Sequence, residues 1–104
     1  MTMIDTVDHD DWLAEIRDRL QETWESKSFQ LNDLTAAAPS PAEADAHAAL
    51  IVKTQQALGD SAAALRRIED GQYGVCEACA RQIPRERLEA LPHVRTCVSC
   101  PRSR

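Results

Sequence analysis

Two C-x-x-C pairs are the residues of this 104-residue chain whose types and spacing could do chemistry. Cys76 and Cys79 form the first pair and, after a spacer of 17 residues, Cys97 and Cys100 form the second. Each pair makes a tight turn that presents two thiolates to one ion, and the spacing falls in the range of zinc ribbons and fingers. Four thiolates fill the tetrahedral coordination of Zn²⁺ and leave no position for water or substrate. The sequence therefore predicts one structural zinc ion on these four cysteines, which stabilises folding and does not catalyse.

Other uses of the four cysteines stay open. Two disulfides are disfavoured in the reducing cytoplasm, where we expect the protein. A thioredoxin-like redox pair would need a βαβ pattern around one of the pairs, and none is recognisable. An iron–sulfur centre can also be held by four cysteines. The histidines stand singly, without a ligand-like partner, and are expected in solvent: His9, His47 and His93.

The cytoplasmic expectation rests on two absences in the sequence. The first eleven residues are acidic and contain no apolar h-region of the kind found in a secretory signal. No stretch approaches 18 uninterrupted apolar residues, so we expect no membrane span. Cysteine pairs in a reducing compartment more often bind metal than form disulfides, which agrees with the zinc prediction.

Charge is distributed unevenly along the chain. Residues 1–80 carry 15 acids and 6 bases, a net charge of −9, whereas residues 81–104 carry 2 acids and 6 arginines, a net charge of +4. Most of the molecule would therefore repel duplex nucleic acid, and we expect no sequence-specific DNA binding. The arginines between Arg81 and Arg104 remain a candidate contact for phosphates or for an acidic protein surface.

A first helix is predicted over about residues 9–35. Asp8 or Asp10 could cap its first turn, and Pro39 follows its end. Apolar residues recur at three-, four- and seven-residue intervals along one face of this helix. They are Leu13, Ile16, Leu20, Trp24, Leu31 and Leu34.

A second helix is predicted over about residues 41–70. Ser40, Pro41 and Glu43 form a capping box with proline at the first helical position, where its missing N–H is not needed. Gly71 is the candidate C-cap, and Gly59 inside the helix should cost ~1 kcal/mol relative to alanine. The apolar positions of this helix include Ile51, Leu58, Leu65 and Ile68.

Two helices of nearly equal length with a short connection predict an antiparallel hairpin. In that register Trp24 lies near Ile51, and Ile16 lies near Leu65. We thus expect a mostly all-α fold, with a coiled-coil hairpin in residues 1–71 and a small four-cysteine zinc-finger module with a short helix in residues 72–104. The hairpin buries one seam and is compatible with a monomer.

The segment around the cysteines resembles a known family. Arg66-Arg-Ile-Glu-Asp-Gly-Gln-Tyr-Gly-Val-Cys-Glu-Ala-Cys79, then Ile83-Pro84, Arg87-Leu-Glu-Ala-Leu-Pro92 and Cys97-Val-Ser-Cys100 are closely similar to the DksA/TraR family of C4-type zinc-finger proteins. The resemblance is strong over about residues 64–100. It implies a hairpin that enters the secondary channel of bacterial RNA polymerase and changes promoter output through acidic residues at its tip.

Two departures from the family pattern matter for that implication. The family's tip motif, Asp-x-x-Asp-x-Ala, does not occur, so the candidate partner-binding acids are Asp33, Glu43 and Asp45. Glu43 also has a structural explanation as the acid of the capping box. Ala80 stands after Cys79 where the family usually has glycine, and positive φ there would strain an alanine by roughly 1 kcal/mol or more.

Three functions follow from these observations. The first is a bacterial transcription regulator that binds RNA polymerase through the hairpin tip. The second is a zinc-stabilised adaptor that uses the same hairpin on a different protein. The third is a weak nucleic-acid-binding zinc module. We expect no enzyme, because the sequence offers no nucleophile–base pair, open metal position or phosphate-binding loop.

Overall fold

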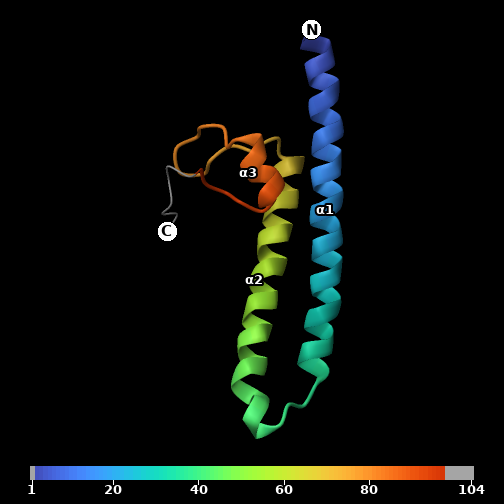
Figure 1. Cartoon of the computed structure of the whole chain (residues 1–104), viewed down its shortest axis with the longest axis vertical. Coiled ribbons are helices and arrows are strands. Elements are labelled where there is room, and N and C mark those ends of the chain that lie inside the picture. Colours follow the sequence, from blue (N-terminus) through green and yellow to red (C-terminus); the bar gives the residue numbers. More distant parts are fainter. Residues whose placement is uncertain (1, 98–104) are drawn as a thin grey trace.

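The fold is a long helical hairpin with a small irregular module at one end (Figure 1). It is described from a computed structural model, which covers residues 2–97 and the side chains from His9 onward. The elements in order are α1 (Thr2–Ala36), a 3₁₀ turn η1 (Pro41–Glu43), α2 (Ala44–Glu69) and α3 (Arg85–Ala90). The molecule measures 61 × 27 × 21 Å. Within the described residues, no helix combines the length and apolarity that a membrane span requires. The predicted fold class, a mostly α-helical hairpin followed by a cysteine-containing module, is confirmed.

Helix α1 begins earlier than the sequence predicted. We expected a start at residue 9 with Asp8 or Asp10 as the cap, but both residues lie inside α1, which starts at Thr2. The physical reason is that nothing interrupts the helix there, since Pro39 is the first proline of the chain and Gly59 its first glycine. The N-terminal part of α1 therefore extends past the end of α2 (Figure 1).

Local signals define both ends of the second helical segment. The backbone N–H of Ser40 donates to Glu43 Oε1 at 3.3 Å, as the capping box requires. The turn at Pro41–Glu43 is 3₁₀ rather than α, so α2 itself starts at Ala44. At the other end Gly71 has φ +75°, its N–H donates to the carbonyl of Ile68, and that of Gln72 donates to Arg67. These paired bonds form a Schellman cap, as expected for a glycine at this position.

The apolar part of the hairpin seam lies at the end near the module. Ile16, Leu20 and Ala64 are buried together there, and Leu65 and Ile68 pack against them. The predicted proximity of Ile16 to Leu65 is confirmed. The same cluster includes two aromatic residues that also contact the module, Trp12 and Tyr73.

Farther along, the seam is less well packed, and the prediction for Trp24 was wrong. Trp24 is 40% exposed and lines a shallow groove with Ala62 and Leu65 instead of packing near Ile51. An α-helix turns about 100° per residue, so Trp24 lies about 80° around α1 from Ile16, at the edge of the face that meets α2. Thr23 and Lys27 of α1, among others, line a groove with α2 instead. No residue from 21 to 53 is buried.

Gly59 offers a test of the helix energetics. It is exposed in α2, and a Cβ added there would meet nothing within 4 Å. Gly59→Ala should therefore raise the free energy of unfolding by about 1 kcal/mol, because alanine loses less backbone entropy in a helix. Urea unfolding of the zinc-loaded protein, followed by circular dichroism, measures this change.

Gly71→Ala is the matched control for that measurement. The φ of +75° at Gly71 strains any L side chain. The free energy of unfolding should therefore fall by about 1 kcal/mol in Gly71→Ala, whereas it rises in Gly59→Ala. Equal effects at the two glycines would contradict the different backbone roles assigned to them.

Candidate metal centre

The first cysteine pair lies in a tight antiparallel turn. Val75 and Gln82 form an isolated β-bridge, and the N–H of Ile83 donates to the carbonyl of Gly74 at 2.7 Å. Inside this bridge the N–H of Cys76 donates to the carbonyl of Arg81 at 2.8 Å. The turn closes when the N–H of Ala80 donates to the carbonyl of Cys76 at 2.9 Å. We call residues 74–83 the first knuckle.

Three of the predicted ligands converge on one point. The sulfur atoms of Cys76, Cys79 and Cys97 all lie within 4.8 Å of one another. Cys76 and Cys97 are buried, and Cys79 is half-buried. The fourth predicted ligand, Cys100, lies outside the described residues.

The sulfur spacing fits a zinc ion. Bonds of about 2.3 Å at a tetrahedral centre place neighbouring thiolates about 3.8 Å apart. Cys79 Sγ and Cys97 Sγ are 3.7 Å apart, which is also far too long for a disulfide. A multi-iron cluster would place at least one of these three cysteines on a different iron atom and therefore farther from the others. The described residues contain no βαβ unit, since the bridge at Val75 is their only β pairing. The sulfurs therefore suit a single structural zinc.

Backbone dipoles favour the thiolate form of Cys76. Burial raises the pKa of its thiol, but backbone N–H groups of Cys97, Cys79 and Ala78, together with a hydrogen bond from the Cys79 side chain, lower the pKa to about 6. One of these donors, the N–H of Cys97, is 3.4 Å from Cys76 Sγ. The thiolate is the form that binds metal, so this ligand is prepared for a cation at neutral pH.

A small apolar cluster supports the cysteines. Ile83 and Leu88, which lie between the two cysteine pairs in the sequence, are buried with Cys76 and Cys97. Leu88 lies on α3, whose start follows Pro84. The side chains packed against the cluster are Trp12, Tyr73, Cys79 and Val94.

Tyr73 fixes the loop that follows α3. Its hydroxyl donates to the carbonyl of Pro92 at 2.8 Å. Burial raises the pKa of Tyr73 to about 12, against the opposing effect of the Arg19 and Arg67 charges. The hydroxyl therefore remains a proton donor throughout the physiological range.

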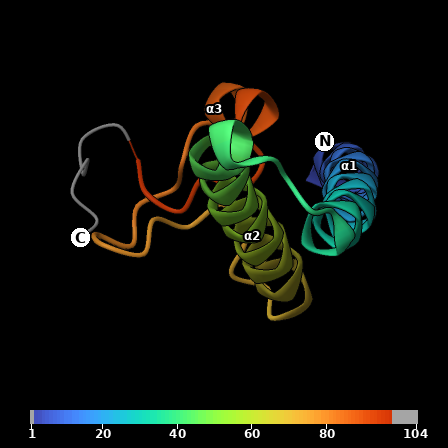
Figure 2. The same cartoon turned by 90° about the horizontal axis from the view of Figure 1, so that it is seen from below.

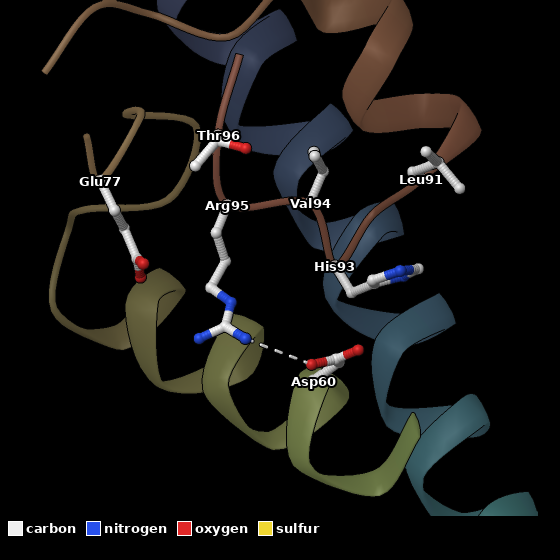
Figure 3. Close-up of a pocket in the computed structure, with 7 residues that line it drawn as sticks. All are labelled: Asp60, Glu77, Leu91, His93, Val94, Arg95 and Thr96. Carbon is white, nitrogen blue, oxygen red and sulfur yellow. Dashed lines mark hydrogen bonds and ion pairs between the residues drawn. The ribbon is translucent and has the colours of Figure 1, made fainter. Parts of the chain in front are cut away.

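Polar contacts attach the module to both long helices, and sequence reasoning missed them. Trp12 Nε1 of α1 donates to Glu89 Oε2 of α3 at 2.7 Å, and the Arg85 guanidinium lies 4.5 Å from the centre of the Trp12 ring. Arg95 reaches from the loop before Cys97 to Asp60 of α2, at 3.4 Å (Figure 3). No sequence pattern indicates these pairs, because their members are 35 or more residues apart.

Arg67 of α2 makes the most extensive of these attachments. Its guanidinium donates to the carboxylate of Glu77, to the carbonyl of Gln72 at 3.2 Å and to the carbonyl of Val75. Its side chain is only 14% exposed. Arg66 and Arg67 belong to the segment that resembles the family, but the contacts of Arg67 could not be predicted from the sequence.

The candidate tip acids lie at the opposite end of the hairpin from the cysteines. Asp33 is in the last turn of α1, and Glu43 and Asp45 are at the start of the second helical segment. All three are exposed, and Glu43 holds the N–H of Ser40. The view along the hairpin shows the connection between the helices crossing this end (Figure 2). The structure thus brings the acids to one end without bringing them to the metal centre.

The other candidate residues are scattered. His9 and His93 are exposed and His47 is half-buried, so the histidines form no cluster with the cysteines in the described part of the chain. Among the module's arginines, Arg95 pairs with Asp60, and Arg87 donates to the carbonyl of Thr96 at 3.5 Å. Two further arginines of the basic segment 81–104, Arg102 and Arg104, lie outside the described residues.

Comparison with known proteins agrees with the sequence resemblance. Residues 71–103 match the family model of the prokaryotic dksA/traR C4-type zinc finger. An uncharacterised protein of Aquifex aeolicus is 51% identical over 37 residues, which are 36% of this chain and 26% of that protein. General stress protein 16O of Bacillus subtilis is 54% identical over 35 residues, covering 34% of this chain and 22% of that protein. The match thus spans about a quarter of the length of these relatives.

A solved structure extends the likeness beyond the finger. The chain is similar to transcription factor DksA2 from Pseudomonas aeruginosa, with a TM-score of 0.55 and 25% sequence identity. The alignment covers 86% of this chain and 74% of the other, so it includes much of the hairpin.

Ala80 should be a strained residue of the first knuckle. Its φ is +64°, the left-handed conformation that we anticipated for this position. Ala80→Gly should raise the free energy of unfolding by up to about 1 kcal/mol, because relief of the strain exceeds the entropy that glycine adds to the unfolded chain. Thermal unfolding of both proteins at saturating zinc tests this, and a lower melting temperature for the glycine variant would contradict it.

Zinc removal should unfold the module while much of the hairpin persists. Too little apolar material surrounds the cysteines to hold residues 72–97 without the metal. After chelation, two-dimensional NMR should show loss of amide dispersion for these residues, with helical signals retained in α1 and α2. Preserved dispersion in the module would show that the metal is not required for its fold.

Proposed function

Because residues 71–103 match the family model of the dksA/traR C4-type zinc finger, we propose that this protein is a bacterial transcription regulator that binds RNA polymerase. The observation that carries the proposal is the likeness to transcription factor DksA2 across both the hairpin and the module. In this proposal the hairpin enters the secondary channel of the polymerase. The module stays at the base, held by zinc on Cys76, Cys79, Cys97 and Cys100.

The shape of the molecule supports this use of the hairpin. Its 61 Å long axis runs along two helices that end in a short connection, while the module occupies the other end (Figure 1). Such a rod can reach into a narrow channel with its tip. The bulk of the module limits how far it enters.

The tip acids have different roles in the proposal. Asp33 and Asp45 are exposed carboxylates that would meet the partner directly. Glu43 is exposed as well, but its carboxylate accepts the N–H of Ser40 and thereby sets the shape of the turn. A variant of Glu43 must therefore keep this hydrogen bond if it is to report on charge alone.

An adaptor for another protein is the second candidate. The observation in its favour is that the tip lacks Asp-x-x-Asp-x-Ala and instead carries a groove lined mostly by small and apolar residues. The lining residues include Ala37, Ala38, Pro39, Ala46 and Leu50. Binding to nucleic acid through the module has less support, because Arg95 and Arg87 are already engaged within the protein.

The decisive experiment combines binding to purified RNA polymerase core with transcription in vitro. The variant Asp33→Asn/Glu43→Gln/Asp45→Asn removes the tip charges and keeps an acceptor for Ser40. We expect it to bind the polymerase nearly as well as the unaltered protein and to lose most of its effect on transcription. The base and shaft of the hairpin, which in this proposal provide most of the contact with the polymerase, are unchanged.

The matched control removes three exposed acids from the shaft: Asp18→Asn/Glu22→Gln/Glu25→Gln. It should keep the transcriptional effect. If both triple variants retain the effect, the partner is right and the tip assignment is wrong. If the unaltered protein does not bind polymerase at micromolar concentration, the regulator proposal fails and the adaptor is favoured.

A further inference from the structure

Arg67 stands between the hairpin and the first knuckle. It lies in the last turn of α2, and its guanidinium has three acceptors beyond the end of that helix. These are the Glu77 carboxylate and the carbonyls of Gln72 and Val75. Its own carbonyl accepts the N–H of Gln72 at 2.8 Å, so side chain and backbone hold the same segment.

Two of these acceptors flank a metal ligand. Val75 and Glu77 are the neighbours of Cys76, the most deeply buried of the three described cysteines. Glu77 leaves the knuckle loop and points toward α2 (Figure 3). Its backbone N–H donates to the carbonyl of Arg95 at 2.9 Å, which ties the loop before Cys97 to the same point. Residues on both sides of the metal centre therefore converge near Arg67.

We propose that Arg67 is a positioning residue for the zinc site: by holding both neighbours of Cys76, it couples zinc binding to docking of the module on α2. Arg67 does not touch the metal. It fixes the backbone that aims the Cys76 sulfur, in the way that partners beyond the ligands tune a metal site. This goes beyond the proposed function and holds whichever partner the hairpin binds.

Arginine suits this role better than lysine. The planar guanidinium donates in several fixed directions, so it can bridge a carboxylate and two carbonyls at once. Lysine would keep the charge opposite Glu77 but could not hold all three acceptors in that geometry. Coupling is reciprocal, so if Arg67 strengthens zinc binding, zinc must strengthen the Arg67 contacts by the same factor.

The first test measures zinc affinity of the full chain by competition with a chromophoric chelator. Arg67→Gln should weaken zinc binding by about 10-fold or more, the range seen when partners of metal ligands are removed. Arg67→Lys and Glu77→Gln should give smaller losses, because each keeps part of the network. In the double variant, Arg67→Gln and Glu77→Gln together should weaken zinc binding by a smaller factor than the product of the two single-variant factors.

Two controls separate positioning from general stability. Arg66→Gln alters the neighbouring exposed arginine and should leave zinc affinity unchanged. Leu31→Ala weakens half-buried packing near the tip of the hairpin, at the opposite end from the knuckle, and should also leave zinc affinity unchanged. If Arg67→Gln binds zinc as tightly as the unaltered protein, or if either control weakens zinc binding equally, the proposal is overturned.

The second test examines the reverse direction of the coupling by NMR. With zinc bound, the Arg67 Nη–H groups, which donate to Glu77, Gln72 and Val75, should give a resolved, slowly exchanging signal, and chelation should collapse it to the fast exchange of the Arg66 guanidinium. Persistence of that signal without zinc would overturn the coupling. If Arg67→Gln fails to fold, as judged by circular dichroism, the zinc affinities of Arg67→Lys and Glu77→Gln test the proposal instead. Unaltered zinc affinity in both would count against the proposal.

Discussion

The bond between zinc and cysteine sulfur is the interaction on which the fold of the module, and with it the attachment of the module to the hairpin, depends. Among its described residues, the module buries only Ile83 and Leu88 beside its cysteines. Burial of an aliphatic side chain supplies about 1.5–3 kcal/mol, whereas zinc binding by a finger peptide supplies about 10–16 kcal/mol. The metal thus takes the place of a hydrophobic core. Once the module is folded, it offers Glu77, Glu89 and Arg95 at fixed positions for the hairpin to contact.

The features that could be predicted from the sequence are those with local causes. Cys76 and Cys79 share one turn, so their spacing alone indicates a metal site. The capping box at Ser40 and Glu43 and the glycine cap at Gly71 likewise depend on residues within a few positions of one another. The positive φ of Ala80 was anticipated because glycine is usual after the second cysteine of this family.

Failures occurred where distant parts of the chain decide the outcome. Trp24 continues the apolar spacing of α1, but it lies at the edge of the face that meets α2, and periodicity alone cannot show how far that face extends around the helix. Trp12 of α1 donates a hydrogen bond to Glu89 of the module, 77 residues away, and no local pattern indicates such a contact. The attachments of Arg67 and Arg95 use charged residues that look like ordinary surface positions until the fold brings their acceptors near.

The sparse packing in the middle and distal part of the hairpin has a consequence for its dynamics. With no buried residue from 21 to 53, the helices there are held mainly by their own backbone hydrogen bonds and by a few half-buried side chains. Segments with few buried apolar contacts open at a lower free energy than the global unfolding. Amide protection should thus form a gradient, high beside Ile16 and Ala64 and declining toward Pro39. The distal arm can adapt its separation to a binding partner while the metal-anchored end keeps its shape.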